Sequence, residues 1–433
     1  MTRDPASARP AQPPRIAMRR ATDRPEVVLD LSRLMSRMLH GAPTGVDRVE
    51  MAYARTLLRH IPDRLAFAAV HPAGRYGRLP ESAVVRFLDR TAARWERGGA
   101  DETPRAVRRS ALAHCWSLLP RPVPPPSGPR ILLQASPHHL DRQPMVAAKL
   151  IREQARFVCL VHDLIPISHP EYARPGGAAR HERRIRTIDA LADGILANSR
   201  ATLDAFEQRS DRGQADSALT IRIAHLGVDH PGTPLEIAAA PNEPAAADTS
   251  TPYFLCIATI EPRKNHLLLL HVWRSLVAML GTERTPRLVL VGRRGWENEN
   301  ILDMLDRCPG LRGVVLEQAR SSDAVLRTLL CDACALLMPS FAEGFGLPII
   351  EALAAGVPVL ASDLPAHREA GGGVPDYLDP IDGPSWRRAI LDYAAPSSPR
   401  RAAQRIRLGG WRPPTWDDHI GTALALVDEV AAC

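Results

Sequence analysis

Two acidic residues bracket a glycine-rich turn in the segment PSFAEGFGLPIIEALAAGVPV, residues 339–359. Glu343 precedes the turn and Glu351 follows it. The turn itself consists of Gly344, Phe345, Gly346 and Leu347. A proline suits the first turn of a helix, so we expect a helix from about residue 348, with Glu351 in its first turn.

This arrangement favours an anionic ligand that carries hydroxyl groups. Glycines let the backbone approach a ligand closely, and the free N–H groups of a helix start attract an anion. Carboxylates beside a phosphate suit the hydroxyl groups on either side of it, which is the layout of a nucleotide diphosphate sugar. The alternative is that Glu351 is only a helix-start acid favoured by the helix dipole and that Glu343 is a solvated loop acid.

Two adjacent cations, Arg263 and Lys264, follow an apolar run in the segment TIEPRKN, residues 259–265. A helix is expected to begin near Asn265, and two cations beside a helix start can pair with a diphosphate. Lys264 is one of only two lysines in the chain, so the arginine-rich composition does not explain it. A solvated basic turn is the alternative.

Histidines follow two other apolar runs. His162 comes directly after residues 156–161 and is followed by Asp163, whereas His138 and His139 come after residues 130–134. We expect His162 at the edge of a ligand cleft, although such a histidine can simply bond a backbone carbonyl. His138, His139 and Asp163 are weaker candidates for acceptor binding, and solvation at the surface explains the two histidines equally well.

Two motifs are absent. No G-x-G-x-x-G follows a predicted strand, which disfavours a nicotinamide oxidoreductase. No Asp-x-Asp occurs, so we predict no metal site and no cofactor other than a nucleotide sugar co-substrate.

The elements that position these residues are short apolar runs alternating with amphipathic segments, which predicts an α/β protein with parallel sheets. Strands are expected at residues 26–31, 65–70, 130–134, 156–161, 194–198 and 220–226, and then at 253–258, 287–292, 313–317, 335–339 and 357–362. Residues 229–252 are rich in Pro, Ala and Thr and predict an interdomain linker. Two doubly wound, Rossmann-like domains would then face each other across a cleft, with ligands beyond the carboxyl ends of the strands.

Composition narrows the function further. The net charge is +7, but residues 1–230 alone carry 36 Lys and Arg against 24 Asp and Glu, a net of +12, and the remainder carries −5. This basic half suits an anionic partner or membrane surface, or it reflects arginine-rich composition alone. No basic run is interleaved with aromatics, so nucleic acid is disfavoured. Residues 1–25 predict a disordered lead-in without a secretory signal, and we expect a cytoplasmic protein.

Five ordered segments resemble the retaining glycosyltransferases of family 4, notably the mannosyltransferase-like members. Residues 339–359 are similar to the family's E-x7-E signature, and IATIEPRKN (257–265) resembles its GT-x-EPRKN turn. The other three are APTGVDRVEMAYA (42–54), LVHDLIPISHPEY (160–172) and ILANSRATLDAF (195–206). Ala258 departs from the family's usual glycine, which changes little.

The resemblance implies a GT-B fold. It has an acceptor domain at residues 26–228, a nucleotide-sugar domain at 253–408, and a helix at 409–433 that returns to the first domain. It implies that Arg263 and Lys264 hold the donor diphosphate, that Glu343 contacts donor-sugar hydroxyls and that Glu351 accepts from the ribose. His162 would lie near the reaction centre, so the catalytic group is His162, Arg263, Lys264 and Glu343. Gly45 and the backbone of residues 344–347 would line the donor pocket.

The implied reaction moves a hexosyl group, with mannosyl as one candidate, from a nucleotide diphosphate sugar to a glycan or lipid-linked acceptor in cell-surface polysaccharide biosynthesis. Anomeric configuration is retained and no metal is needed. A peripheral position at the cytoplasmic face of the inner membrane would suit such an acceptor. The alternatives are a catalytically inactive sugar-nucleotide-binding protein and a sugar-nucleotide epimerase with the same fold.

Overall fold

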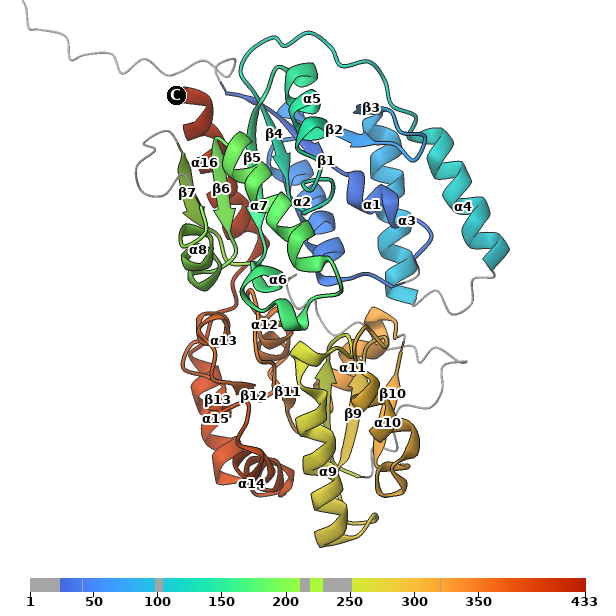
Figure 1. Ribbon diagram of the computed structural model, residues 1–433, viewed down its shortest axis with the longest axis vertical. Helices are drawn as coiled ribbons and strands as arrows, with labels where there is room; N and C mark the ends of the chain where they lie inside the picture. Colours follow the sequence, from blue (N-terminus) through green and yellow to red (C-terminus); the bar gives the residue numbers. More distant parts are fainter. Residues whose placement is uncertain (1–23, 41, 98–103, 211–218, 229–250, 320) are drawn as a thin grey trace, which may run out of the picture.

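The computed structural model describes residues 24–40, 42–97, 104–210, 219–228, 251–319 and 321–433. They form two α/β lobes, stacked one above the other in Figure 1. The lead-in predicted at residues 1–25 and the linker predicted at 229–252 lie almost wholly outside the described residues, so both stay predictions.

The first lobe contains a seven-stranded sheet in the order β3-β2-β1-β4-β5-β6-β7. Its strands are β1 (Glu26–Asp30), β2 (Leu65–Val70), β3 (Tyr76–Leu79), β4 (Arg130–Gln134), β5 (Arg156–Val161), β6 (Gly194–Ala197) and β7 (Thr220–Ile223). All neighbouring strands are parallel except β2 and β3, which are antiparallel.

Helices cover both faces of this sheet, and this explains why its strands are apolar throughout (Figure 1). Val27 and Leu29 pack into the core that contains α2 and α16, whereas Val28 packs into the core that contains α5 and α7. The helices are α1 (Ser32–Ser36), α2 (Gly45–His60), α3 (Glu81–Arg97), α4 (Pro104–Ser117), α5 (Gln143–Glu153), α6 (Ile165–Ser168), α7 (Gly177–Leu191) and α8 (Arg200–Glu207), with 3-10 turns at Pro62–Arg64 and Pro170–Tyr172.

The second lobe contains a six-stranded sheet in the order β10-β9-β8-β11-β12-β13, with every pair parallel. Its strands are β8 (Tyr253–Ile257), β9 (Arg287–Val291), β10 (Val315–Gln318), β11 (Leu336–Met338), β12 (Val359–Ser362) and β13 (Asp376–Leu378). Its helices are α9 (His266–Leu280), α10 (Glu299–Arg307), α11 (Asp323–Cys331), α12 (Leu347–Ala354), α13 (Pro365–Gly371), α14 (Gly383–Ala394) and α15 (Pro399–Gly409), with 3-10 turns at Pro262–Lys264 and Pro309–Leu311.

The last helix, α16 (Trp416–Ala432), packs on the first lobe against β6, β7 and α2 (Figure 1). The hydroxyl of Tyr53 in α2 lies 2.6 Å from Nε2 of His419. A Cβ placed on Gly194 would lie 2.9 Å from a methyl carbon of Val430, so a side chain at Gly194 would push this helix away from β6.

The α/β class and all the predicted strands are confirmed, with ends that shift by up to three residues. Two strands were not predicted, β3 and β13, because they are short and not uniformly apolar. β3 contains the buried Arg78, which pairs with Glu26 and Glu153 at 2.8 Å. Within the described ranges, no helix combines the length and apolar character that crossing a bilayer requires.

Candidate active site

The two predicted cations meet the predicted turn acid in the second lobe. Arg263 and Lys264 lie in the 3-10 turn after β8, and Glu343 lies in the loop after β11, a neighbouring strand of the same sheet. Nη1 of Arg263 donates to Glu343 at 2.8 Å, and Nζ of Lys264 donates to its other carboxylate oxygen at 2.5 Å. The sequence separation is about 80 residues, so only the adjacency of β8 and β11 brings these side chains together.

Other hydrogen bonds fix the geometry of this group. Arg263 also donates to the carboxylate of Glu261 at 2.9 Å and to the carbonyl of Ala342 at 2.7 Å. The hydroxyl of Ser340 donates to Glu343 at 2.7 Å. The guanidinium is therefore held in one plane and cannot swing freely into solvent.

The electrostatics keep the group charged. Burial raises the pKa of Glu343, but the nearby charges of Lys264 and Arg263 outweigh it and bring the pKa well below its ordinary value. Burial lowers the pKa of Arg263, and attraction to Glu343 and Glu261 raises it above its ordinary value. Arg263 and Glu343 are thus ionised at neutral pH, and the charged guanidinium is what binding of a diphosphate requires.

The E-x7-E segment folds largely as expected, with one correction. Gly346 has φ of 121° and caps α12, Pro348 lies in the first turn, and Gly356 follows the helix with φ of 79°. Since α12 begins at Leu347, Glu351 is its fifth residue and lies beyond the first turn, so the predicted first-turn position is wrong. Glu351 is half-buried.

The turn contacts the first lobe closely. A Cβ on Gly344 would lie 2.2 Å from the carbonyl oxygen of His162. The side chain of Phe345 is 4% exposed and stacks on the ring of His225 with centroids 5.5 Å apart. Only the backbone of Phe345 is therefore available to a ligand. Gly45 starts α2, and a Cβ there would lie 3.8 Å from Leu347, so these two predicted residues face each other across the lobes.

His162 directly follows β5 and lies opposite the turn. Its Nε2 lies 2.8 Å from the carbonyl of Ala135, and since a carbonyl can only accept, Nε2 carries the proton. Burial lowers the pKa of His162, so the ring is neutral at pH 7. The carbonyl bond that we considered as an alternative explanation is thus present, beside the turn that contains Glu343.

Of the weaker acceptor candidates, Asp163 lies beside His162 and the turn, whereas His138 and His139 have no direct bond to either His162 or Glu343 within the described residues. Asp163 is next to His162, and its carboxylate accepts a hydrogen bond from the backbone N–H of Ile165. A Cβ added to Gly344 would lie 2.9 Å from the Cβ of Asp163, so Asp163 lies against the turn. His138 and His139 lie against each other with ring centroids 4.0 Å apart. Their electrostatic neighbours include Asp30 and Lys149, and no bond joins them to His162 or Glu343 among the described residues.

Two residues that had no predicted role, Ser199 and Thr202, bridge the lobes, and a third, Asn198, holds the His162 loop within the first lobe. Oγ of Ser199 donates to the carbonyl of Gly344 at 2.6 Å, and Oγ1 of Thr202 donates to the same carbonyl at 3.1 Å. Nδ2 of Asn198 donates to the carbonyl of His162 at 2.8 Å. The segment ILANSRATLDAF, which contains all three, was the available signal.

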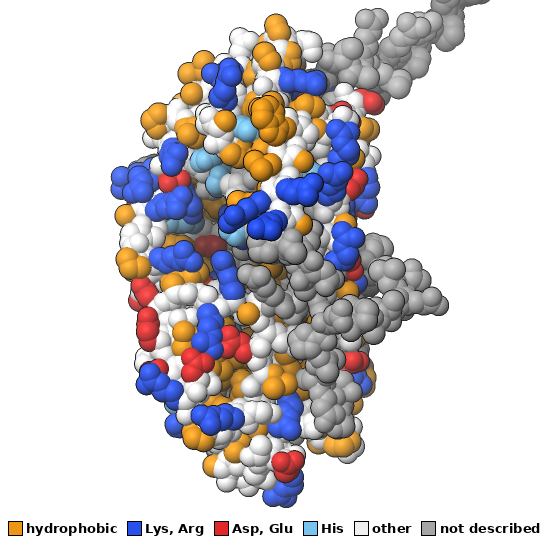
Figure 2. All heavy atoms as spheres, turned by 90° about the vertical axis from the view of Figure 1, so that its right-hand side faces the viewer, with side chains coloured by type: hydrophobic (Ala, Val, Ile, Leu, Met, Phe, Trp, Pro, Cys, Tyr) orange, Lys and Arg blue, Asp and Glu red, His pale blue; other side chains and the backbone are white. Residues whose placement is uncertain are grey.

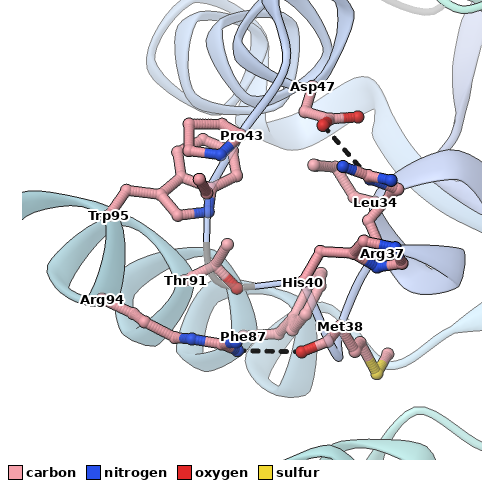
Figure 3. Close-up of a pocket in the computed structure, with 11 residues that line it drawn as sticks. Leu34, Arg37, Met38, His40, Pro43, Asp47, Phe87, Thr91, Arg94 and Trp95 are labelled. Carbon is pink, nitrogen blue, oxygen red and sulfur yellow. Dashed lines mark hydrogen bonds and ion pairs between the residues drawn. The ribbon is translucent and has the colours of Figure 1, made fainter. Parts of the chain in front are cut away.

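A separate small cavity lies between α1, the loop before α2 and α3, and it contains none of the predicted site residues (Figure 3). Asp47 points toward Arg37 on one side of it, and Arg94 donates to the carbonyl of Met38 on another (Figure 3). Across the described residues, no group of three or more His, Cys, Asp or Glu side chains is arranged to hold a metal ion.

Comparison with known proteins agrees with this geometry. Residues 251–393 match the family described as "Glycosyl transferases group 1". The chain is 30% identical over 270 residues to O-antigen chain mannosyltransferase B of Escherichia coli, covering 61% of this chain and 68% of that protein. It is 25% identical over 362 residues to the serotype-specific mannosyltransferase WbdA of Escherichia coli, covering 78% of this chain and 44% of that protein. The chain spans less than half the length of the WbdA proteins that it matches.

Solved structures show the fold. A sucrose-phosphate synthase from Thermosynechococcus elongatus superposes with a TM-score of 0.61 at 17% identity, over 95% of this chain and all of that one. Anabaena HepE in complex with UDP superposes with a TM-score of 0.55 at 14% identity, over 94% of this chain and 99% of that one. The two lobes therefore have the GT-B arrangement.

Proposed function

The chain belongs to the group 1 glycosyl transferases, the retaining glycosyltransferases of family 4, and from this we propose that it transfers a hexosyl group from a nucleotide diphosphate sugar to a hydroxyl group. The acceptor is a glycan or lipid-linked oligosaccharide in cell-surface polysaccharide biosynthesis. Mannose is the first sugar to test, since O-antigen chain mannosyltransferase B is a relative.

The convergence of Arg263, Lys264 and Glu343 carries this proposal. Two cationic side chains at one point suit the two phosphates of the donor, with Arg263 as a planar fork and Lys264 as a point charge. When the phosphates pair with the cations, the carboxylate of Glu343 loses its partners and can accept hydrogen bonds from the sugar hydroxyls. Glu351, further along the same segment, would accept from the ribose.

The family retains anomeric configuration, and the same assignments favour one route to that outcome. A double displacement needs a carboxylate nucleophile at the anomeric carbon, and Glu343 and Glu351 are assigned to hydroxyl groups. We therefore favour substitution on one face. Arg263 and Lys264 stabilise the leaving diphosphate, which takes the proton of the acceptor hydroxyl. His162, neutral and oriented by Ala135, lies beside the sugar and positions it.

We also propose that the acceptor is lipid-linked and that the protein contacts a membrane surface. The net charge of +12 in residues 1–230 suits a lipid-linked acceptor at the cytoplasmic face of a membrane. Binding to anionic vesicles should then weaken as salt is raised. Binding that ignores salt, or no binding to such vesicles, would contradict the peripheral membrane contact and leave the transferase proposal standing.

The decisive experiment combines a donor screen with one double variant. Thermal-shift measurements with GDP-, UDP-, dTDP- and ADP-sugars identify the donor, and release of the nucleoside diphosphate then measures turnover. Arg263→Ala with Lys264→Ala should lower turnover by at least about a hundredfold, because it removes two charge-assisted contacts to the leaving group. Near-normal turnover in a folded double variant would refute the proposed donor site.

A matched control uses two exposed arginines of the same lobe, Arg284 and Arg312, which lie at the other edge of the sheet near the starts of β9 and β10. The Arg284→Ala, Arg312→Ala variant loses the same amount of positive charge. It should keep the turnover of the wild type, which separates a local effect at the donor site from a general effect of charge.

A further inference from the structure

Arg184, in α7, is a half-buried cation that has no carboxylate partner among the described residues. Its Nε is buried and has no hydrogen-bond partner in that part of the chain. An arginine cannot lose its charge, and burying its Nε–H without an acceptor costs free energy. Such a residue is expected where an anionic ligand supplies the missing partner.

The position of Arg184 along α7 places it on the helix face that looks toward the carboxyl edge of the first sheet. It lies four residues after Arg180 and three after His181, so the three share one face of α7. Arg180 pairs with Asp141 at 3.1 Å, and Nε2 of His181 donates to the carbonyl of Asp163 at 2.9 Å. Asp141 follows β4 and Asp163 follows β5, so this face of α7 looks onto the loops beside His162.

Arg184 shares an electrostatic neighbour, Asp163, with Arg263 of the proposed donor site. Burial and the nearby charges of Arg180 and Arg33 lower the pKa of Arg184, while Asp141 and Asp163 oppose this effect. Asp163 is also an electrostatic neighbour of Arg263, and Arg33 is one of His162. Contacts support the same placement: His181, on the Arg184 face of α7, bonds to the carbonyl of Asp163, and Asp163 lies against Gly344 of the second lobe. The face of α7 that contains Arg184 therefore looks toward the boundary between the lobes.

Arg33 is held in place by the start of α2. Its Nε donates to Asp47 at 2.6 Å, and its Nη2 donates to the hydroxyl of Thr44 at 2.9 Å. Asp47 also pairs with Arg37 at 3.3 Å, so one carboxylate serves two guanidinium groups and a net positive field remains beside Arg184. Arg33 is paired, whereas Arg184 has no carboxylate within ion-pair distance among the described residues. Figure 2 shows many Lys and Arg side chains on the upper lobe, around the hollow between the lobes, which suits the approach of an anion.

We propose that Arg184, supported by the field of Arg33, binds an anionic group of the acceptor, a phosphate or a carboxylate, near the hydroxyl that is glycosylated. The inference rests on the transferase function proposed above and narrows the acceptor to an anionic class. The phosphates of the donor could supply the same chemistry, but Arg263 and Lys264 already lie opposite to receive them.

The test isolates this anion site from the donor site. In the Arg263→Gln, Lys264→Gln double variant, calorimetric titration with inorganic phosphate reports the remaining site. Adding Arg184→Gln should weaken phosphate binding about tenfold or more, because a charge-assisted contact is lost. Arg184→Lys should recover part of the affinity as a point charge. Arg186→Gln, on the same helix with a 71% exposed side chain, should change nothing.

Three results would overturn the inference. The first is the absence of phosphate binding in the double variant, and the second is an unchanged affinity after Arg184→Gln. The third concerns the source of the anion: if Arg184→Gln alone weakens binding of the donor's nucleoside diphosphate as strongly as it weakens phosphate binding, the site belongs to the donor. Because these titrations need no turnover, a failure of the transferase proposal would appear separately, as the absence of any nucleotide-sugar binding in the donor screen.

Discussion

Removing the carboxylate of Glu343 should destabilise the unliganded protein and make its stability depend on the donor nucleotide. Glu343→Ala removes the acceptor of two ion pairs, at 2.8 Å to Arg263 and 2.5 Å to Lys264, and of the bond from Ser340. The side chains of Glu343, Arg263 and Lys264 are 9%, 19% and 13% exposed, so solvent compensates little of the loss.

The size of the destabilisation depends on which hydrogen-bond partners Arg263 and Lys264 retain in Glu343→Ala. Breaking a buried pair by removing one partner costs about 3–5 kcal/mol, since a charge stays buried without compensation. Arg263 retains Glu261 and the carbonyl of Ala342, so the cost falls near the lower value. For a domain of the size of the second lobe, about 3 kcal/mol corresponds to a fall in Tm of roughly 6–12 °C.

Differential scanning calorimetry with and without the nucleoside diphosphate measures both effects. The nucleotide should raise the Tm of Glu343→Ala more than that of the wild type, because its phosphates neutralise cations that the variant leaves without Glu343. The matched control is Glu317→Ala, which breaks a surface pair with the 41% exposed Arg294 and should cost less than about 1 kcal/mol. A Tm shift no larger than that of the control, or an equal response to nucleotide, would show that Glu343 does not hold the cations as described.

Three further outcomes are expected. In Gly344→Ala the new Cβ would lie 2.2 Å from the carbonyl oxygen of His162, so the two lobes must move apart. This variant should lower turnover at least about tenfold and enlarge the radius of gyration in solution scattering. The control is Gly373→Ala, whose Cβ would have no atom within 4 Å. Burial and the charge of Asp30 raise the pKa of Glu50 from 4.5 to about 8, so Glu50 lowers stability progressively between these pH values and by a constant amount above them. The free energy of unfolding of Glu50→Gln, measured by urea denaturation, should therefore rise relative to that of the wild type as pH rises from 5 to 8. The same free-energy difference between the two proteins at pH 5 and at pH 8 would contradict the raised pKa of Glu50. A chelator should leave the rate of sugar transfer unchanged, since Arg263 and Lys264 rather than a metal ion would balance the phosphate charge. Loss of activity that added Mg²⁺ restores would refute this.

The sequence by itself determined the layers of both lobes and the local setting of the site. Runs such as Val27–Leu29 are apolar at every position because helices cover both faces of the sheet, and this pattern is visible without coordinates. A proline and a glycine likewise mark the first turn and the end of α12. Arg263, Lys264 and Glu343 were recognisable because each follows a strand, where a parallel sheet collects its functional residues.

Only the tertiary structure decided which of these residues meet and which partners they lack. The pairing of Arg263 with Glu343 depends on β8 lying beside β11, and the bond from Ser199 to Gly344 depends on how the lobes pack. The missing partner of Arg184 is a property of its surroundings and not of its own sequence position. Local periodicity reports the face on which a side chain lies, whereas contacts between residues far apart in the chain arise from the packing of whole elements, which no local pattern specifies.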